Sequence, residues 1–194
     1  MPEAVGILRG ELPNIEIVIS SETSPELAGA LLKRKIDVAF LRPVQEMPDL
    51  VFKPLIKEPL IAILRTDHQL AALDAFSAEN LVGETFISVA NNAPAVRAAI
   101  DDYLRCSAVE ITPDHEATST YMAISLVVST RGIALLPLYT QNFLPPSVTS
   151  RPIKGEAPTI DLVLGYHKEN KSPLLKLFLL RVDDLVDRGS KKSH

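Results

Sequence analysis

The sequence is poor in several features that would assign it to a particular class of protein. It has one cysteine, Cys106, in 194 residues, so no disulfide can form within the chain and a reducing compartment is favoured. No apolar run reaches the length of about 18 residues that a membrane-spanning helix needs. The first residues also lack the basic and apolar parts of a signal peptide. We therefore expect a cytoplasmic protein with no membrane partner.

Positive charge is scarce too. Lys and Arg number 20 against 24 Asp and Glu, which gives a net charge of −4. The chain therefore has no basic field with which to bind nucleic acid. What it does have is an ordinary globular composition, 46% hydrophobic and 23% charged, with enough apolar residues to bury a core.

Motifs for catalysis or metal binding are missing as well. The histidines are scattered singly, and the one in His115-Glu116 is expected in a loop without a second ligand at metal-binding spacing. Glycine-rich phosphate loops are absent, and Cys106 has no local histidine partner. Asp101-Asp102 is interpreted as a solvated helix face, because adjacent helical residues point about 100° apart. We expect no enzyme, no metal site and no cofactor.

Strand and helix patterns alternate along the chain. Apolar spacing and turn residues predict helices at residues 2–14, 21–35, 93–106, 119–132 and 172–188, and strands at residues 15–20, 36–41, 59–65, 85–90, 133–137 and 159–167. Residues 66–83 are predicted to be a connection with a short helix. The strands are almost continuously apolar, which favours a parallel sheet covered on both faces, with a βαβ unit over residues 15–41.

This order of elements predicts an α/β fold in two halves. No low-complexity linker separates them, so ordered segments must connect them. We place the first subdomain at residues 1–73 plus 167–190 and the second at residues 74–166, and we interpret residues 191–194 as a solvated tail.

Several stretches, taken together, resemble one family. They are "LPNIEIVI" followed by "SPELAGALLKRKIDVAF", then "PLIAILRTDHQLA", and finally "VVSTRGIALLP". In this order and spacing they resemble the effector-binding domain of LysR-type bacterial transcription regulators, over nearly the whole chain. The resemblance implies two α/β subdomains of periplasmic-binding-protein type II, with a small-molecule effector in the cleft between them.

Two parts of the family pattern are not matched. The N-terminal winged helix-turn-helix has no counterpart here, so the resemblance implies that DNA is bound only by a part that this chain lacks. The opening strand of the domain, of type L-x-I-G, has no counterpart either. It normally lies between the strands that match residues 15–20 and 36–41, so without it backbone groups would stay unpaired. The family also implies a homodimer or tetramer, and an apolar stripe of Leu27, Leu31 and Leu32 suggests a contact surface.

Arg42 is the first candidate ligand-binding residue. It directly follows the apolar strand "IDVAFL" and precedes Pro43, and parallel α/β sheets bind ligands beyond the carboxyl ends of their strands. The resemblance independently places a cleft-facing arginine here in relatives that sense carboxylates. The alternative is a solvated loop arginine.

Five further candidates lie at two strand-to-helix turns. Ser24 is predicted to be the N-cap of its helix, with Pro25 at the first helical position, and a helix N-terminus favours an anion. The resemblance places a ligand-contacting hydroxyl at Ser24, with Thr23 as a weaker neighbour. In the second half it places ligand contacts at Asn92, Ala93 and Pro94, which could equally be ordinary turn residues.

The sequence therefore predicts the effector-sensing domain of a LysR-type regulator. The effector is expected to be a small anionic molecule, a carboxylate and an aromatic one among the candidates. Two alternatives belong to other classes: a solute-binding protein of a transporter, and an enzyme on the same two-lobed scaffold. The missing signal peptide argues against the first, and the missing catalytic cluster argues against the second.

Overall fold

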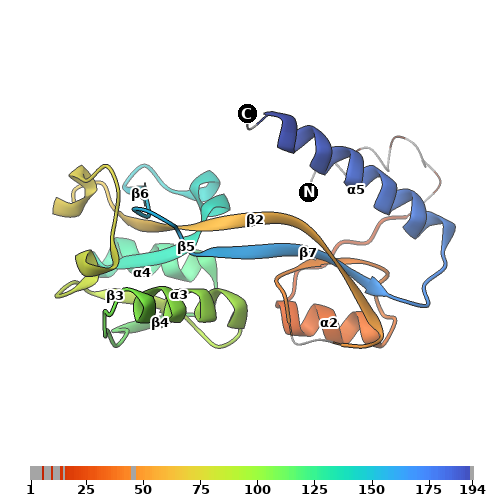
Figure 1. The fold of residues 1–194 in the computed structure, drawn as a ribbon, viewed down its shortest axis with the longest axis horizontal. Helices are drawn as coiled ribbons and strands as arrows, with labels where there is room; N and C mark the ends of the chain where they lie inside the picture. The colour runs from red at the N-terminus through yellow and green to blue at the C-terminus, as the bar shows by residue number, and fades with distance from the viewer. Residues whose placement is uncertain (1–5, 7–9, 11–13, 15, 45–46, 193–194) are drawn as a thin grey trace. The chain divides into compact units, whose positions relative to one another are not determined.

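The computed structural model describes residues 6, 10, 14, 16–44 and 47–192. The chain packs as two compact units (Figure 1). Unit 1 comprises Met1–Ile56 and Val163–His194, and unit 2 comprises Lys57–Leu162. The chain passes between the units inside two long strands, β2 (Leu50–Arg65) and β7 (Thr159–His167). The sequence placed these passages later, after residue 73 and after residue 166, because a strand that continues through both units gives no change in pattern where one unit ends.

Unit 1 is a small sheet with a helix on each face. Strand β1 (Ala39–Leu41) pairs antiparallel with β7, and helices α2 (Ser24–Leu32) and α5 (Pro173–Lys192) pack on it. Ala39 and Leu41 belong to the cluster with α2, whereas Phe40 packs against Phe178 of α5 with ring centroids 6.0 Å apart. Successive strand residues point to opposite faces, so β1 contributes to two cores.

Close packing in unit 1 requires a glycine on β7. Gly165 is paired with Ala39, and a Cβ atom placed on it would lie 2.9 Å from Leu41 Cδ2 and 3.1 Å from Leu31 Cδ1. A larger residue would therefore force the Leu41 and Leu31 side chains to move, and Leu41 ends β1 directly before Arg42.

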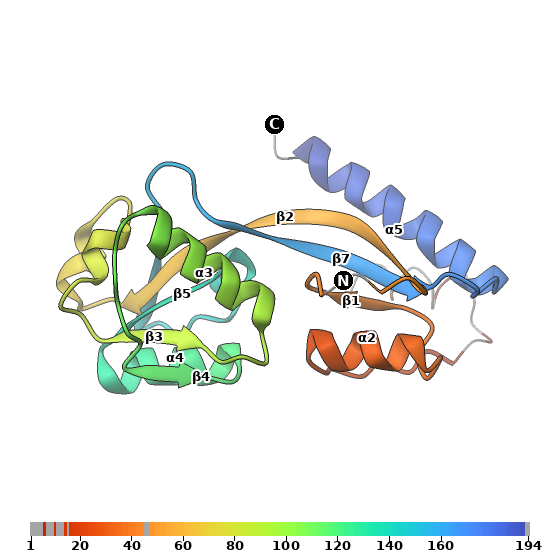
Figure 2. The ribbon, with the colours of Figure 1, turned by 60° about the horizontal axis from the view of Figure 1, so that its bottom comes forward.

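Unit 2 contains a five-stranded sheet in the order β6-β2-β5-β3-β4. The elements that complete it are β3 (Phe86–Val89), α3 (Pro94–Cys106), β4 (His115–Ala117), α4 (Thr120–Thr130), β5 (Ile133–Pro137) and β6 (Val148–Pro152), with short 3-10 helices at Gln69–Ala72, Ala78–Leu81 and Leu138–Phe143. All residues of β3 and β5 are buried, so both faces of these strands are covered. Helices α3 and α4 lie against them (Figure 2).

Strand directions differ from the expected parallel sheet. β3 runs parallel to both β4 and β5, but β2 is antiparallel to β5 and β6, and β1 is antiparallel to β7. The parallel prediction therefore holds for β3, β4 and β5 of unit 2 and is wrong for β1, β2, β6 and β7, which have antiparallel partners.

The predicted strand at residues 15–20 is also wrong over its described part. Residues 16–20 adopt no strand, and Val18 and Ile19 are 83% and 67% exposed. Strand β1 pairs with β7, and no described strand pairs with residues 16–20. An apolar β-branched stretch without a ladder partner has no place for its backbone hydrogen bonds in a sheet. The predicted helix at residues 2–14 lies largely outside the described residues.

Two further sequence interpretations change. The leucine stripe on α2 mostly serves its own unit: Leu31 is fully buried and Leu27 packs beside it, while Leu32 is 38% exposed. It gives no support to an intermolecular surface on α2. Strands β4 and β6 were not predicted, because "HEA" and "VTSRP" are short and polar. The predicted helices that became α2, α3, α4 and α5, and the strands that became β3, β5 and β7, are confirmed.

Candidate functional site

The structure brings together the two main candidates of unit 1. The backbone N–H of Arg42, the first residue after β1, donates a hydrogen bond to Ser24 Oγ at 3.0 Å. Both residues are half-buried. Helix α2 leads into β1, so the start of the helix and the end of the strand lie at the same edge of unit 1. The sequence predicted that Arg42 and Ser24 lie at this edge. The hydrogen bond between them joins residues 18 positions apart and holds the strand end to the helix start.

Thr23, and not Ser24, is the N-cap of α2. Its backbone is extended, with φ −69° and ψ 155°. The Thr23 N–H and hydroxyl both donate to Glu26 Oε2, at 2.9 and 2.6 Å. These two hydrogen bonds, the side-chain one first, lower the pKa of the Glu26 carboxyl below its ordinary value. Sequence reasoning placed the cap one residue late because Ser24-Pro25 is itself a typical start; a glutamate at the third helical position was the signal for Thr23.

The Thr23 and Ser24 hydroxyls differ in the hydrogen bonds that they make. The Thr23 hydroxyl already donates its proton to Glu26, which weakens it as a ligand contact. The Ser24 hydroxyl accepts from Arg42, and a hydroxyl that accepts one hydrogen bond still has its own proton to donate. The carboxylate of Glu26 also offsets the positive end of the α2 dipole. Among the candidate residues of this edge, Arg42 is the one that carries a positive charge.

The candidate turn of unit 2 joins β3 to α3. Asn92 is exposed, and its side-chain Nδ2 donates to Thr118 O at 2.8 Å. Ala93 is the N-cap, its N–H donates to Ala90 O at 3.1 Å, and Pro94 is the first helical residue. Asn92 thus ties the turn after β3 to the turn after β4, which makes it a structural residue as well as a candidate contact.

Arg97 on α3 stabilises this turn through hydrogen bonds. Its Nη1 donates to Val89 O at 3.1 Å and to Glu116 Oε1 at 2.8 Å, and its Nε lies 3.1 Å from both carboxylate oxygens of Asp101. The hydrogen bond to Glu116, the largest of these influences, raises the pKa of Arg97 above its ordinary value. Sequence reasoning missed Arg97, because the strand that carries Glu116 was not predicted.

A second strand-to-helix turn, also missed, lies beside the first. β4 is parallel to β3, so their carboxyl ends share one edge. Ser119 is the N-cap of α4 and its Oγ accepts from Met122 N at 3.1 Å, while Thr120 Oγ1 lies 3.0 Å from Tyr139 Oη. The signal was the hydroxyl-rich run "TST" before an apolar helix. Unit 2 therefore presents polar, uncharged groups from several loops at this edge.

The residues weighed for catalysis have other roles. His68 Nδ1 accepts from Leu70 N at 3.2 Å, and its Nε2 lies 3.3 Å from Glu84 Oε2, which is a structural turn. Asp101 and Asp102 are exposed and pair with arginines of their own helix, Arg97 and Arg105. His115 and Glu116 lie in strand β4 and not in a loop, because pairing with β3 orders them. Cys106 is exposed at the end of α3.

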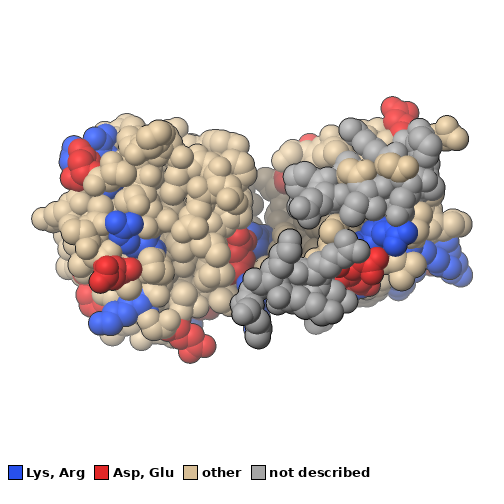
Figure 3. Space-filling view, turned by 90° about the horizontal axis from the view of Figure 1, so that it is seen from above, with Lys and Arg blue, Asp and Glu red and all other residues tan. Residues whose placement is uncertain are grey.

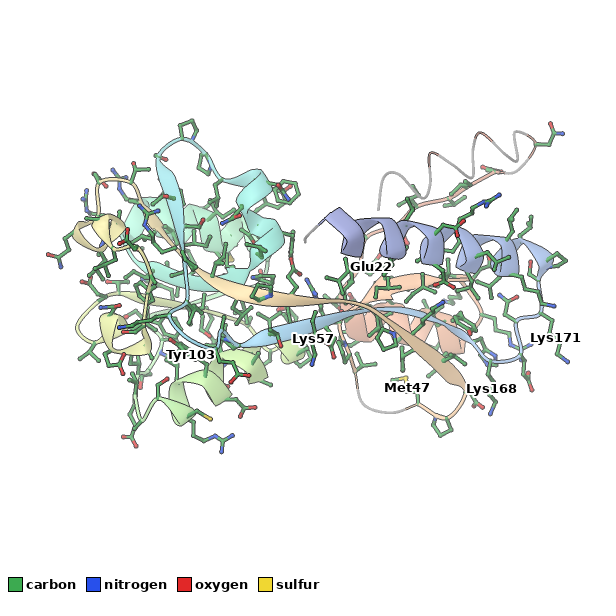
Figure 4. The ribbon with its side chains drawn as sticks, turned by 45° about the horizontal axis from the view of Figure 1, so that its top comes forward. Glu22, Met47, Lys57, Tyr103, Lys168 and Lys171 are labelled. Atoms are coloured by element: carbon green, nitrogen blue, oxygen red, sulfur yellow. The ribbon has the colours of Figure 1, made fainter. Side chains whose placement is uncertain are left out.

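Among the residues that the structure describes, no three His, Cys, Asp or Glu side chains are grouped so that they could hold a metal ion. None of the described helices is long and apolar enough to cross a membrane. On the face drawn in Figure 3, lysines and arginines of the described residues are scattered among uncharged and acidic groups. Lys168, which follows β7 and is labelled in Figure 4, forms an ion pair with Asp49 in which Nζ lies 2.7 Å from Oδ1.

Comparison with known proteins identifies the class. The family described as the LysR substrate binding domain matches residues 1–185. The fold agrees: the effector-binding domain of BenM with its effector benzoate superposes with a TM-score of 0.85 at 17% identity, covering 98% of this chain and 87% of that one. The QuiR effector-binding domain in complex with shikimate gives 0.83 at 20% identity, covering 96% and 90%. The chain belongs to the LysR substrate-binding domain family, with the periplasmic-binding-protein type II fold.

Its curated relatives are transcription regulators. The Hca operon transcriptional activator HcaR of Escherichia coli (strain K12) is 27% identical over 190 residues, which cover 95% of this chain and 62% of the relative. The HTH-type transcriptional regulator AlsR of Bacillus subtilis (strain 168) is 27% identical over 183 residues, covering 92% and 60%. The chain thus spans less than two thirds of the length of these relatives. The resemblance stated from the sequence is confirmed.

Proposed function

We propose that this chain is the effector-sensing part of a LysR-type transcription regulator. It binds a small carboxylate, aromatic carboxylates included. DNA is bound by a helix-turn-helix that belongs to the full-length regulator. A ligand that prefers one arrangement of the domains shifts the population toward it, by no more than its differential affinity for the two states.

The observation that carries the proposal is the pairing of Arg42 with Ser24. Arg42 lies beyond the carboxyl end of β1, and its backbone holds Ser24 Oγ at 3.0 Å. A guanidinium can bind a carboxylate through two parallel hydrogen bonds, and the Ser24 proton adds a third donor. A guanidinium on the residue whose backbone N–H bonds to Ser24 Oγ suits a carboxylate better than a neutral or cationic ligand.

A second set of candidate contacts lies in unit 2. Asn92, Ala93 and Pro94 form the turn before α3, and the amide of Asn92 anchors that turn to Thr118. The ligands named for two structural neighbours, benzoate and shikimate, are both carboxylates. They support the choice of ligand class and do not identify the effector of this chain.

A thermal-shift experiment tests the ligand class. Benzoate, shikimate and short-chain carboxylates are compared with neutral analogues such as benzamide. A ligand at 100 times its dissociation constant adds about 2.7 kcal/mol to the free energy of unfolding, which raises the Tm of a domain of this size by roughly 5–10 °C. We expect a shift with a carboxylate and none with its amide. Stabilisation by the amides but by no carboxylate, or turnover of the ligand, would contradict the proposal.

A further inference from the structure

Charge is divided unevenly between the two units. Unit 1 carries 13 Lys and Arg against 12 Asp and Glu, whereas unit 2 carries 7 against 12. With the histidines neutral, unit 1 has a net charge of +1 and unit 2 a net charge of −5, which together make the −4 of the whole chain. Electrostatic attraction between copies of the chain therefore depends on where these charges gather on the surface of each unit.

The loop after α2 and the loop after β7 lie against each other at one end of unit 1. Arg34 of the first loop forms an ion pair with Glu169 of the second, and Asn170 Nδ2 donates to Asp37 Oδ1 at 3.1 Å. These contacts join residues 135 and 133 positions apart. The two loops therefore form one surface, although they are distant in the sequence.

This surface carries more positive charge than its own acidic residues neutralise. The basic end of unit 1 comprises Lys33, Arg34, Lys35, Lys168 and Lys171, together with Asp37, Asp49 and Glu169, and all of them are exposed. Lys168 and Lys171 are labelled in Figure 4. Within the part of the chain that the structure describes, Lys33, Lys35 and Lys171 take part in no ion pair. Three lysines from two loops are thus available to a partner.

The acidic charge of unit 2 is concentrated in residues 101–116. This segment holds five Asp and Glu against a single basic residue, Arg105. It includes the second half of α3 and all of β4, which is the strand at the edge of the unit 2 sheet. Asp102 and Glu116 are 66% and 51% exposed, and Glu110 is exposed as well. The segment is therefore an accessible surface whose charge is opposite to that of the basic end.

We propose that the basic end of unit 1 binds the acidic segment of unit 2, residues 101–116, in a second copy of this chain. The contact joins surfaces of two different copies, so it depends on the surface of each unit alone. Opposite charges favour this pairing, and like charges disfavour contact between two basic ends or between two acidic segments. Because the groups are exposed, water and salt screen them, and each charge pair changes the association constant by at most about fivefold.

Sedimentation equilibrium on the 194-residue chain tests the contact through charge reversal. Lys33→Glu with Lys35→Glu makes the basic end acidic, and Asp102→Lys with Glu110→Lys makes the acidic segment basic. Each double variant alone brings like charges together, but an equimolar mixture of the two again offers opposite charges at both possible contacts. Wild type, both variants and the mixture are measured at about 0.05 M and about 0.5 M salt. Urea unfolding of each variant checks that it is folded.

A matched control separates this contact from the effect of net charge. Lys154→Glu with Lys176→Glu changes the net charge by the same amount as the reversal of the basic end, at exposed lysines outside both surfaces. It should leave association nearly unchanged.

We expect wild type to self-associate more strongly at low salt than at high salt. Each reversal variant should associate about tenfold more weakly than wild type at low salt, and the mixture should recover most of the loss. A wild type that stays monomeric at low salt, an equal loss in the control, or no recovery in the mixture would overturn the proposal.

Discussion

Removal of the Arg42 side chain should weaken effector binding much more than folding. Arg42→Ala deletes the guanidinium but keeps the backbone N–H that Ser24 Oγ accepts at 3.0 Å, so the local backbone stays fixed. Truncating one partner of a buried, hydrogen-bonded charge pair costs about 2–5 kcal/mol of binding free energy. That corresponds to a loss of affinity of roughly thirtyfold or more. The free energy of unfolding should change by less than about 1 kcal/mol, since Arg42 is only half-buried.

Three variants make the assay specific. Isothermal titration with the carboxylate that gives the largest thermal shift is run on wild type, Arg42→Ala and Arg42→Lys, with urea unfolding in parallel. Lysine keeps the charge and loses the planar fork, so it should recover only part of the affinity. Arg105→Ala is the control, because this arginine is 75% exposed and pairs with Asp102 on α3. Equal affinities in wild type and both Arg42 variants would show that Arg42 is an ordinary surface residue and would remove the central observation behind the carboxylate site.

Other consequences concern stability and assembly. Ser24→Ala leaves the half-buried Arg42 N–H without its acceptor and should lower the free energy of unfolding by about 1 kcal/mol; urea curves that coincide with wild type would contradict this. Arg131 ends α4 in the left-handed region, at φ 59°, so Arg131→Gly should be more stable than Arg131→Ala by about 1 kcal/mol in the same measurement. Hydrogen bonding from Arg65, the largest influence, lowers the pKa of Asp67 well below its ordinary value; its contribution to stability is present above the unfolded-state pKa of about 4 and is lost as the pH falls toward the folded-state value. Unfolding free energies measured from pH 5 to 3 should therefore fall more steeply in wild type than in Asp67→Asn, and equal slopes would exclude this role. Sedimentation equilibrium at high micromolar concentration should show a homodimer, and a monomer alone would contradict the assembly that the family resemblance implies.

Local sequence was enough to predict the edge of unit 1 that carries the candidate site. "IDVAFL" has the apolar character of a buried strand, and "SPELAGALL" has a typical helix start, so Arg42 and Ser24 could be placed at the end of one element and the start of another. Pro94 likewise marks the start of α3 correctly. These signals are local because capping and the fixed φ of proline act within one turn.

Such local signals do not predict which strands pair when the strands are far apart in the sequence. "HEA" becomes β4 because β3 offers it a parallel partner, and that pairing carries Glu116 to Arg97. Residues 16–20 have stronger β-propensity and form no strand, since no described strand pairs with them. Strand preference depends on neighbours more than on the residues themselves.

The sequence by itself determined the helices α2 to α5, the buried strands β3, β5 and β7, the family, and the positions of Arg42, Ser24 and Asn92 next to the ends of elements. Only the tertiary structure decided the hydrogen bond from Arg42 to Ser24, the anchoring of Asn92 to Thr118 and the bracing of the unit 2 turn by Arg97. Periodicity and capping are properties of neighbouring residues, so they can be read along the chain. The hydrogen bonds that arrange the candidate residues join residues 8 to 26 positions apart. They form only when the strands have paired.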